Sequence, residues 1–447
     1  MKKLRLKVLI STSIIIAAVS FYFYQNRIHE PMDIPDLSPR GGDSNASVEY
    51  LNALHSVERL REEIKKHPDV VKNYVQLAQI FLQEARITGK HHEYIPKAQT
   101  LLNDALKIDP NNFDALITES SVQMTLHQFT KAKELALKAL PFDSYNAFAY
   151  GVLVDANVEL GFYQDAVKYC DKMLSLRPDL RSYARASYLR ELFGETDASS
   201  KAMILAANAG MDGQEDRVWT LYNLGNLYFN QGKIDTAEFI YNGILQERPD
   251  YAFALSGLAE VECTKNNYSK AIELLAKASQ LNPNHLFLQQ LADIYMAARQ
   301  KPAENEMNNQ ILQAFEIHKQ DGYDIHYEYA LYCANHNINL KEALDHAEKE
   351  YEIRPDNIDA LDAYAWTLYK NGKSSDAVPY IDKALRLGTK RAVLFYHAAE
   401  IYHAVGFNSK ALEMVKQCLK ENPYVDTMCR NGANSLYQLL QGFASLK

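Results

Sequence analysis

The sequence predicts an all-α protein: a solenoid of about ten helix–turn–helix repeats with an N-terminal membrane anchor. A small residue recurs every 34 residues, as Ala98, Ala132 and Ala166 show. Apolar side chains recur at spacings of three, four and seven residues, which is the period of an amphipathic helix. The 18 Gly and 14 Pro are few for 447 residues, which argues against a sheet-rich protein with many tight turns. A repeat array also explains the length, because each unit packs only on its neighbours.

The N-terminal segment, residues 1–24, is expected to be a signal anchor or a signal peptide. Four basic residues among the first seven precede an uncharged, mostly apolar run, residues 8–24. A helix from residue 4 to residue 24 is about 30 Å long, which is enough to cross a bilayer core. Aromatic residues 21–24 suit a membrane interface and favour the uncleaved anchor, whereas the small residues 18–20 leave cleavage open. In both interpretations the rest of the chain is exported to the periplasm or the exterior.

Residues 25–46 are expected to form an extended or flexible linker, because three prolines and two glycines lie there. The helical repeat domain is predicted for residues 47–447. Open arrays need a polar helix at each end. We therefore expect residues 47–66 and 428–446 to be capping helices.

The clearest repeat unit begins at Val218 and ends two residues after Pro249. Small residues in it allow its two helices to approach closely, and the proline ends the second helix. In order, its pattern residues are Leu224, Gly225, Tyr228, Ala237, Tyr241 and Pro249. This pattern resembles the tetratricopeptide repeat family, and the resemblance extends from about residue 68 to residue 424. It implies a right-handed superhelix whose first helices line the concave face, and a role in binding other proteins.

The repeat slips out of register in two places. Ala166 and Ala237 are 71 residues apart, three more than two periods, and Ala271 and Ala343 are 72 apart, four more. Each slip is expected to produce a bend or a partner-facing elaboration. A further insertion is expected near residues 89–94, in the turn of the first unit.

No pattern for catalysis, a metal or a cofactor is found, so we predict a non-enzymatic protein that binds none. A phosphate-binding glycine loop, a His-Glu-x-x-His motif and a Cys-x-x-Cys motif are all missing. The pair His91-His92, in the expected insertion, is a weak metal candidate. Five scattered cysteines are not a disulfide framework, although a bond between Cys418 and Cys429 stays open.

The charge disfavours nucleic acid as a partner, because phosphate binding needs a basic surface. The formal net charge is −8, and without the four basic residues of the first 24 the remainder carries −12.

The resemblance implies a partner-binding groove with aromatic and amide side chains. The expected groove residues are Trp219, Tyr222, Asn226, Phe229, Asn230 and Phe253, and a second aromatic group is Trp366, Tyr369 and Tyr396. Rings supply buried area and amides pair with a peptide backbone. Packing between helices is the alternative role for any of these rings. The family's clamp for a peptide carboxylate is not predicted, because Phe253 and Gly257 stand where Lys and Arg would be needed.

The sequence therefore predicts a membrane-tethered, exported scaffold or adaptor that binds protein or peptide segments in its concave groove. Two alternatives stay open: a solenoid that binds a sugar or another small ligand, and a repeat-containing subunit of an envelope assembly complex. A fused enzyme is disfavoured, because the repeats and caps occupy nearly the whole chain.

Overall fold

A computed structural model describes residues 36–41, 47–425, 427 and 429–445. The expected anchor, residues 1–24, lies outside this part. Every regular element in the described part is helical, as predicted. None of these helices is both long and apolar enough to cross a membrane.

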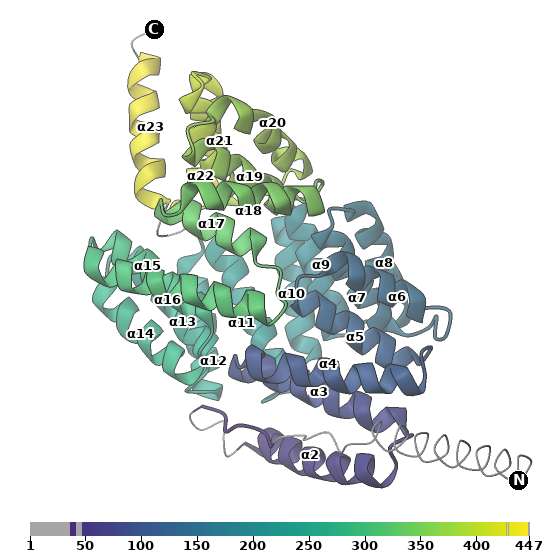
Figure 1. Cartoon of the computed structure of the whole chain (residues 1–447). Coiled ribbons are helices and arrows are strands. Elements are labelled where there is room, and N and C mark those ends of the chain that lie inside the picture. The colour runs from purple at the N-terminus through teal and green to yellow at the C-terminus, as the bar shows by residue number, and fades with distance from the viewer. Residues whose placement is uncertain (1–35, 42–46, 426, 428, 446–447) are drawn as a thin grey trace, which may run out of the picture.

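Twenty of the described helices form ten consecutive antiparallel pairs (Figure 1). The pairs are α3 (Val71–Thr88) with α4 (His91–Ile108), α5 (Phe113–Thr125) with α6 (Phe129–Ala139), α7 (Ala147–Glu159) with α8 (Tyr163–Leu176), α9 (Leu180–Leu192) with α10 (Thr196–Ala209), α11 (Glu215–Asn230) with α12 (Ile234–Glu247), α13 (Ala252–Thr264) with α14 (Tyr268–Leu281), α15 (His285–Ala297) with α16 (Lys301–Gln320), α17 (His326–His336) with α18 (Leu340–Ile353), α19 (Ile358–Lys370) with α20 (Ser374–Ala384), and α21 (Ala392–Ala404) with α22 (Asn408–Glu421). Outside the pairs, α2 (Val48–Lys66) precedes the array and α23 (Arg430–Ser445) follows it.

In the clearest repeat unit, the small residues make room for a large ring. Tyr241 on α12 is 1% exposed. A side chain at Gly225 or Gly257 would overlap its ring. The Tyr241 hydroxyl donates to Asn226 Oδ1 at 2.6 Å, so the buried phenol keeps a hydrogen-bond partner. The predicted reason for the small residues is therefore confirmed in this unit.

The two register slips lie at longer connections. Residues 210–214 join α10 to α11, and the second slip combines the 20-residue helix α16 with the loop 321–325. The prediction of an inserted loop at residues 89–94 is wrong. The turn there is short, and the additional residues lengthen α3 and α4 to 18 residues each.

Residues 36–41 are extended and docked on the array, so this part of the expected linker is not a flexible spacer. Leu37 is 5% exposed. The backbone N–H of Ser38 donates to the Tyr94 hydroxyl at 2.9 Å. Arg40 Nη2 pairs with Glu84 Oε1 at 2.5 Å, with both side chains buried. The prolines and glycines of the sequence carried no information about these tertiary contacts.

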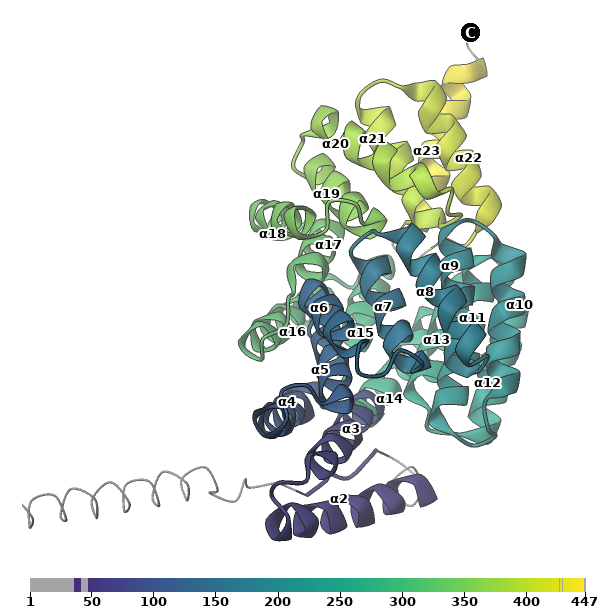
Figure 2. The same cartoon turned by 90° about the vertical axis from the view of Figure 1, so that its right-hand side faces the viewer.

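The array coils so that units far apart in the sequence lie side by side, and Figure 2 shows the C-terminal helices beside the ends of α8 to α11. The Nδ2 atoms of three asparagines donate to carbonyl oxygens in the last turns of α3, α7 and α11. The bonds are Asn282 to Ile87 at 3.1 Å, Asn357 to Val158 at 3.2 Å and Asn422 to Phe229 at 3.1 Å. The partners are 195, 199 and 193 residues apart. One superhelical turn therefore spans between five and six repeats.

Glycines allow the two superhelical turns to touch. Gly161 and Gly194 have φ angles of 79° and 74°, and a side chain on either would overlap the backbone of Asp356 or Gly388 across the interface. Gly406 has the same kind of backbone, with φ of 81°, but an added Cβ there would meet nothing within 4 Å. In the first turn these glycines thus serve two needs, a left-handed backbone and a close approach.

Candidate functional site

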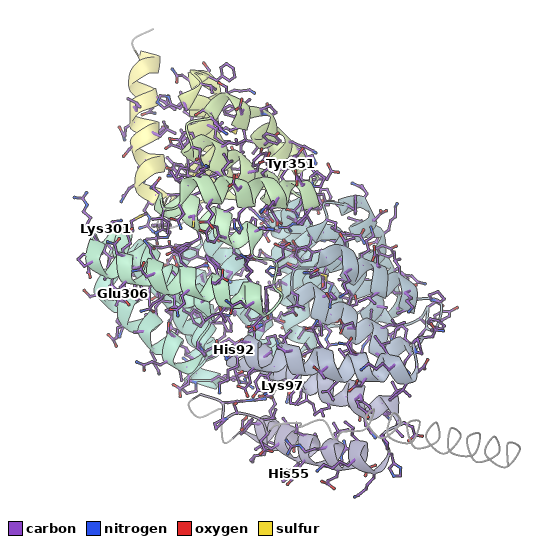
Figure 3. The ribbon with its side chains drawn as sticks, viewed as in Figure 1. His55, His92, Lys97, Lys301, Glu306 and Tyr351 are labelled. Atoms are coloured by element: carbon purple, nitrogen blue, oxygen red, sulfur yellow. The ribbon has the colours of Figure 1, made fainter. Side chains whose placement is uncertain are left out.

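A cavity of about 1480 Å³ lies inside the first superhelical turn; we call it the central cavity. Its wall is formed mainly by the first helices of five successive pairs, α3, α5, α7, α9 and α11. The expectation that first helices line the concave face is thus confirmed for these pairs. Exposed charges such as Lys301 and Glu306 lie instead on the outside of the array (Figure 3).

On α11, four side chains that face the central cavity form one stripe. Trp219, Asn223, Asn226 and Asn230 are spaced by four, three and four residues, which places them on one helix face. Two of the amides are oriented by hydrogen bonds: Asn223 Nδ2 donates to the Trp219 carbonyl at 2.7 Å, and Asn226 Oδ1 accepts from Tyr241. The stripe therefore presents amides held in fixed positions.

Charged side chains in the central cavity are largely paired with one another. Arg185 donates to both carboxylate oxygens of Asp155, at 2.8 and 2.6 Å. Arg86 pairs with Glu215 at 2.5 Å. Burial raises the pKa of the Glu215 carboxyl, and the charge of Arg86 opposes that shift. The wall thus carries charges of both signs that nearly balance.

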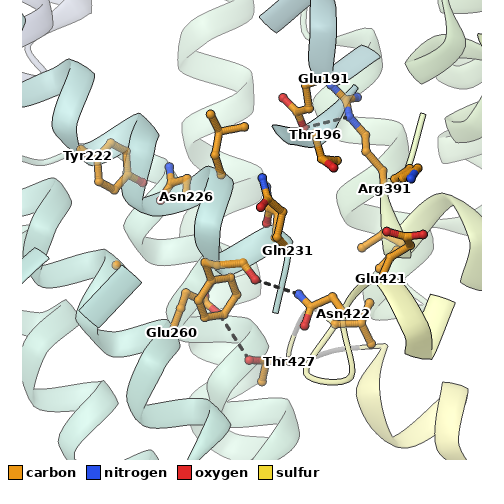
Figure 4. Close-up of a pocket in the computed structure, with 18 of the residues that line it drawn as sticks. Glu191, Thr196, Tyr222, Asn226, Gln231, Glu260, Arg391, Glu421, Asn422 and Thr427 are labelled. Atoms are coloured by element: carbon orange, nitrogen blue, oxygen red, sulfur yellow. Dashed lines mark hydrogen bonds and ion pairs between the residues drawn. The ribbon is translucent and has the colours of Figure 1, made fainter. Parts of the chain in front are cut away.

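A second cavity of about 460 Å³, the inter-turn cavity, lies between the two superhelical turns (Figure 4). Tyr222, Asn226 and Gln231 lie on one side of it, and Glu421 and Asn422 lie across from them. It shares five lining residues with the central cavity, namely Glu191, Asn226, Leu227, Asn230 and Arg391. The internal space therefore continues from the first turn into the interface between the turns.

Comparison with known proteins identifies the type of repeat. The family model described as tetratricopeptide repeat matches residues 228–292. A TPR repeat-containing protein of Methanocaldococcus jannaschii is 26% identical over 341 residues, covering 74% of this chain and 49% of that one. The chain therefore contains tetratricopeptide repeats (TPR).

Other known proteins match parts of the chain. The protein CTR9 homolog of Arabidopsis thaliana is 26% identical over 225 residues, 48% of this TPR protein and 20% of the relative. Among solved structures, the Cut9–Hcn1 hetero-tetramer matches with a TM-score of 0.39 and 14% identity, covering 88% of this chain and 93% of that one. A TPR protein of Thermus thermophilus matches with a TM-score of 0.36 and 22% identity, covering 42% and 99%. The chain spans between a fifth and a half of the length of the curated relatives it matches.

The six residues expected to bind a partner are divided by the structure. Trp219, Asn226 and Asn230 line the central cavity, and Asn226 and Asn230 line the inter-turn cavity as well. Tyr222 and Phe229 line only the inter-turn cavity. Phe253 lines neither of these two spaces.

The rings among these residues pack on one another. The ring centroids of Trp219 and Phe253 are 4.9 Å apart, those of Tyr222 and Phe253 are 5.5 Å apart, and those of Trp219 and Tyr222 are 5.4 Å apart. This is the packing alternative left open for aromatics at helical spacing. Changing Trp219 or Tyr222 would therefore disturb the helix packing as well as the cavity wall.

The late aromatic group is also packed. Trp366 is 4% exposed and stacks on His397 at a centroid distance of 4.0 Å and on Tyr369 at 5.0 Å. Its Nε1 donates to Asn335 Oδ1 at 2.8 Å. A buried indole with a satisfied N–H contributes to the core of the late units rather than to an open groove.

The sequence analysis missed several cavity residues, among them Asn223, Arg185 and Asp155. A signal for one of them was available: Ser121 and Asp155 are one 34-residue period apart, and both line the cavity. The pairing of Arg185 with Asp155 joins α9 to α7, which no local pattern indicates.

Within the described residues, no group of three or more His, Cys, Asp or Glu side chains is placed to hold a metal ion. His91 lies in the first turn of α4 rather than in an inserted loop. All five cysteines are buried, and none of them, including Cys418 and Cys429, forms a disulfide bond.

Proposed function

We propose that this TPR protein is a non-catalytic scaffold that holds an extended segment of a partner protein in the central cavity. The size of the cavity carries the proposal: about 1480 Å³ exceeds the ~300–1,000 Å³ of small-molecule sites. Its fixed amides suit a peptide backbone, which needs donors and acceptors along its length. Proteins of the TPR family generally mediate protein–protein interactions.

We further propose that residues 1–24 tether the protein to a membrane and that the repeat domain is exported. The support is the basic flank followed by the apolar run of residues 8–24. The full chain is expected to sediment with membranes after a high-salt wash, and a variant lacking residues 1–24 is expected to stay in the supernatant. Recovery of the full chain in the supernatant would contradict the tether. Protease added to cells whose outer membrane has been permeabilised, with the inner membrane intact, tests the export. The repeat domain is expected to be cleaved.

The inter-turn cavity favours a second candidate function, the binding of a sugar or another small ligand. Its volume of about 460 Å³ falls within the range of small-molecule sites. Both amide and aromatic side chains line it, including Tyr222, Phe229 and Gln231. A role as a subunit of an envelope assembly complex is compatible with the main proposal and would be revealed by the identity of the partner.

Photo-crosslinking from inside the cavity tests the main proposal. A photoreactive amino acid at Asn230, which is exposed and lines both cavities, is expected to capture discrete protein partners in cells. The matched control is the same amino acid at Phe239, which is 78% exposed on α12 and lines neither cavity. The same adducts from both positions would contradict cavity binding. No protein adduct from Asn230 would favour the small-ligand function.

A larger side chain at Asn230, where the two cavities meet, is expected to block binding of the partner without unfolding the array. We expect Asn230→Arg to lower recovery of the partner captured above at least tenfold and to change the unfolding free energy by less than about 0.5 kcal/mol, because the residue is exposed. Asn242→Arg on the outer helix α12 is the control, since Asn242 is also exposed. Equal binding by the two variants in a pull-down would show that the cavity does not hold the partner.

A further inference from the structure

A cluster of histidines surrounds Tyr323 where the two superhelical turns meet, and we call it the Tyr323 junction. Tyr323, which follows α16, places its hydroxyl 3.1 Å from His91 Nδ1 at the start of α4. Its ring stacks on His318 at a centroid distance of 5.0 Å and meets His127 edge-on at 6.4 Å. His285 adds a fourth imidazole, 4.7 Å from His318. The first turn supplies His91 and His127, and the second supplies the others.

Direct bonds tie the same segments together. The backbone N–H of Asp324 donates to the carbonyl of Leu126 at 3.0 Å. His127 Nδ1 lies 3.1 Å from the carbonyl oxygen of Asp324 and 3.2 Å from Glu328 Oε1. The junction thus replaces, for the α5–α6 turn, the asparagine contacts that join the other units. It exists because the register slip at residues 321–325 leaves a loop there.

The histidines of the junction differ in charge at neutral pH. Burial lowers the pKa of His91 and of His285 to about 4, and the neighbouring imidazoles add to the effect. Burial also lowers the pKa of His318. Although burial opposes it, the hydrogen bond and charge of Glu328 raise the pKa of His127 to about 9. One cationic imidazole therefore sits beside three neutral ones.

The other ionisable groups around the cluster do not cancel this arrangement. His92 on α4 adds repulsion to His91, while Asp321 after α16 favours the charged form of His318. Glu328 on α17 is engaged by His127, whose hydrogen bond and charge hold the carboxyl pKa low against the effect of burial.

The direction of the pH effect follows from these shifts. An opened junction returns each imidazole to its ordinary pKa of 6.5, so the closed form binds fewer protons at His91, His285 and His318. The contribution of His91 and His285 to closure is complete above about pH 6.5 and is lost as the pH falls towards about 4, and that of His318 has the same sign. The contribution of His127 has the opposite sign: it is complete below pH 6.5 and is lost as the pH rises through about 9.

We propose that the Tyr323 junction is an acid-sensitive latch, which opens locally on mild acidification while the other contacts between the superhelical turns stay closed. Charging three imidazoles beside the cationic His127 brings like charges close together in a half-buried interface. The asparagine contact at Phe229 contains no titrating group and does not respond, whereas the one at Val158 lies beside the Glu159–Arg354 ion pair. Opening the latch frees one edge of the superhelix independently of what the cavity binds.

Hydrogen exchange of the full chain at pH 7.0 and pH 5.0, corrected for the intrinsic exchange rates, tests the latch. Protection of residues 122–128 and 322–328 is expected to fall at least tenfold at pH 5.0. Protection of residues 227–232, which include the Phe229 contact, is expected to change less than twofold. Equal protection of the junction at both pH values, or an equal loss at residues 227–232, would overturn the proposal.

Variants separate the latch from general acid sensitivity. Combining His285→Phe with His318→Phe keeps the rings but removes two titrating groups, and we expect it to reduce the loss at pH 5.0 to less than threefold. His55→Gln, on the exposed face of α2, is the control and should behave as the parent (Figure 3). If the double variant fails to fold, His91→Asn provides the test, since the amide of asparagine takes the place of the imidazole Nδ1 that meets the Tyr323 hydroxyl. An unreduced loss in a folded variant would overturn the proposal.

Discussion

Replacing Arg354 with alanine is expected to lower the free energy of unfolding by about 3–5 kcal/mol, because it leaves a buried carboxylate without its cation. Arg354 is 4% exposed at the centre of the interface between the superhelical turns. It pairs with Glu350, which is also 4% exposed, and its Nη1 reaches Glu159 Oε2 of the first turn at 2.6 Å. Its guanidinium also lies 4.9 Å from the centre of the Phe129 ring.

Arg177 provides a matched control for this prediction. Both arginines begin an Arg-Pro-Asp sequence at the end of a repeat unit. The Arg177 side chain is 74% exposed and pairs with Asp179 at 2.9 Å. We expect Arg177→Ala to change the unfolding free energy by less than about 0.5 kcal/mol. Urea unfolding followed by circular dichroism measures both variants, and equal losses would mean that the inter-turn position of Arg354 has no special role.

The second large effect is expected at Gly161. Replacing it with alanine adds a methyl group to a left-handed backbone, at about 1–2 kcal/mol. The same methyl group overlaps the backbone of Asp356 in the other superhelical turn. Relieving the overlap requires one of the two backbone segments to move. We expect this overlap to add about 1–3 kcal/mol and to separate the turns near α7.

Comparison with Gly406→Ala separates the cost of the inter-turn overlap from the cost of the left-handed backbone. The φ angles of Gly161 and Gly406 are 79° and 81°, and an added methyl group at Gly406 meets nothing within 4 Å. The backbone strain is therefore the same in the two variants, and the difference in their urea midpoints measures the inter-turn contact. Two variants of equal stability would contradict the close approach.

The helix pairs could be predicted from the sequence because each pair is encoded within 34 residues. Ala237 and Tyr241 mark one face of α12, and Gly225 marks the point where α11 approaches it. All three residues are within direct reach of each other, so local spacing is sufficient. The two register slips could also be predicted, because the extra residues change the spacing between successive repeat alanines.

The contact between the superhelical turns could not be predicted in this way. Which units meet depends on a small rotation per repeat that accumulates over five or six units. Asn282 and Asn422 each precede a proline and look like ordinary residues after a helix end. Their hydrogen bonds to Ile87 and Phe229 arise only once the array has coiled.

The candidate site was predicted only in part for a related reason. The repeat period shows which face of a helix a residue lies on. It does not show whether the side chain faces the cavity or packs against the neighbouring first helix. Trp219, Tyr222 and Phe253 are large enough to meet across neighbouring helices and pack on each other. The shorter amides Asn226 and Asn230 leave the cavity open.

A double-mutant cycle between Glu159 and Arg354 tests most directly whether the array closes on itself, on which the inter-turn cavity depends. The two residues are 195 apart in the sequence and meet only across the inter-turn interface. Urea unfolding of Glu159→Gln, Arg354→Met, the double variant and the parent is expected to give a coupling free energy of about 1 kcal/mol or more. Additive effects, with a coupling of zero, would contradict the closed superhelix.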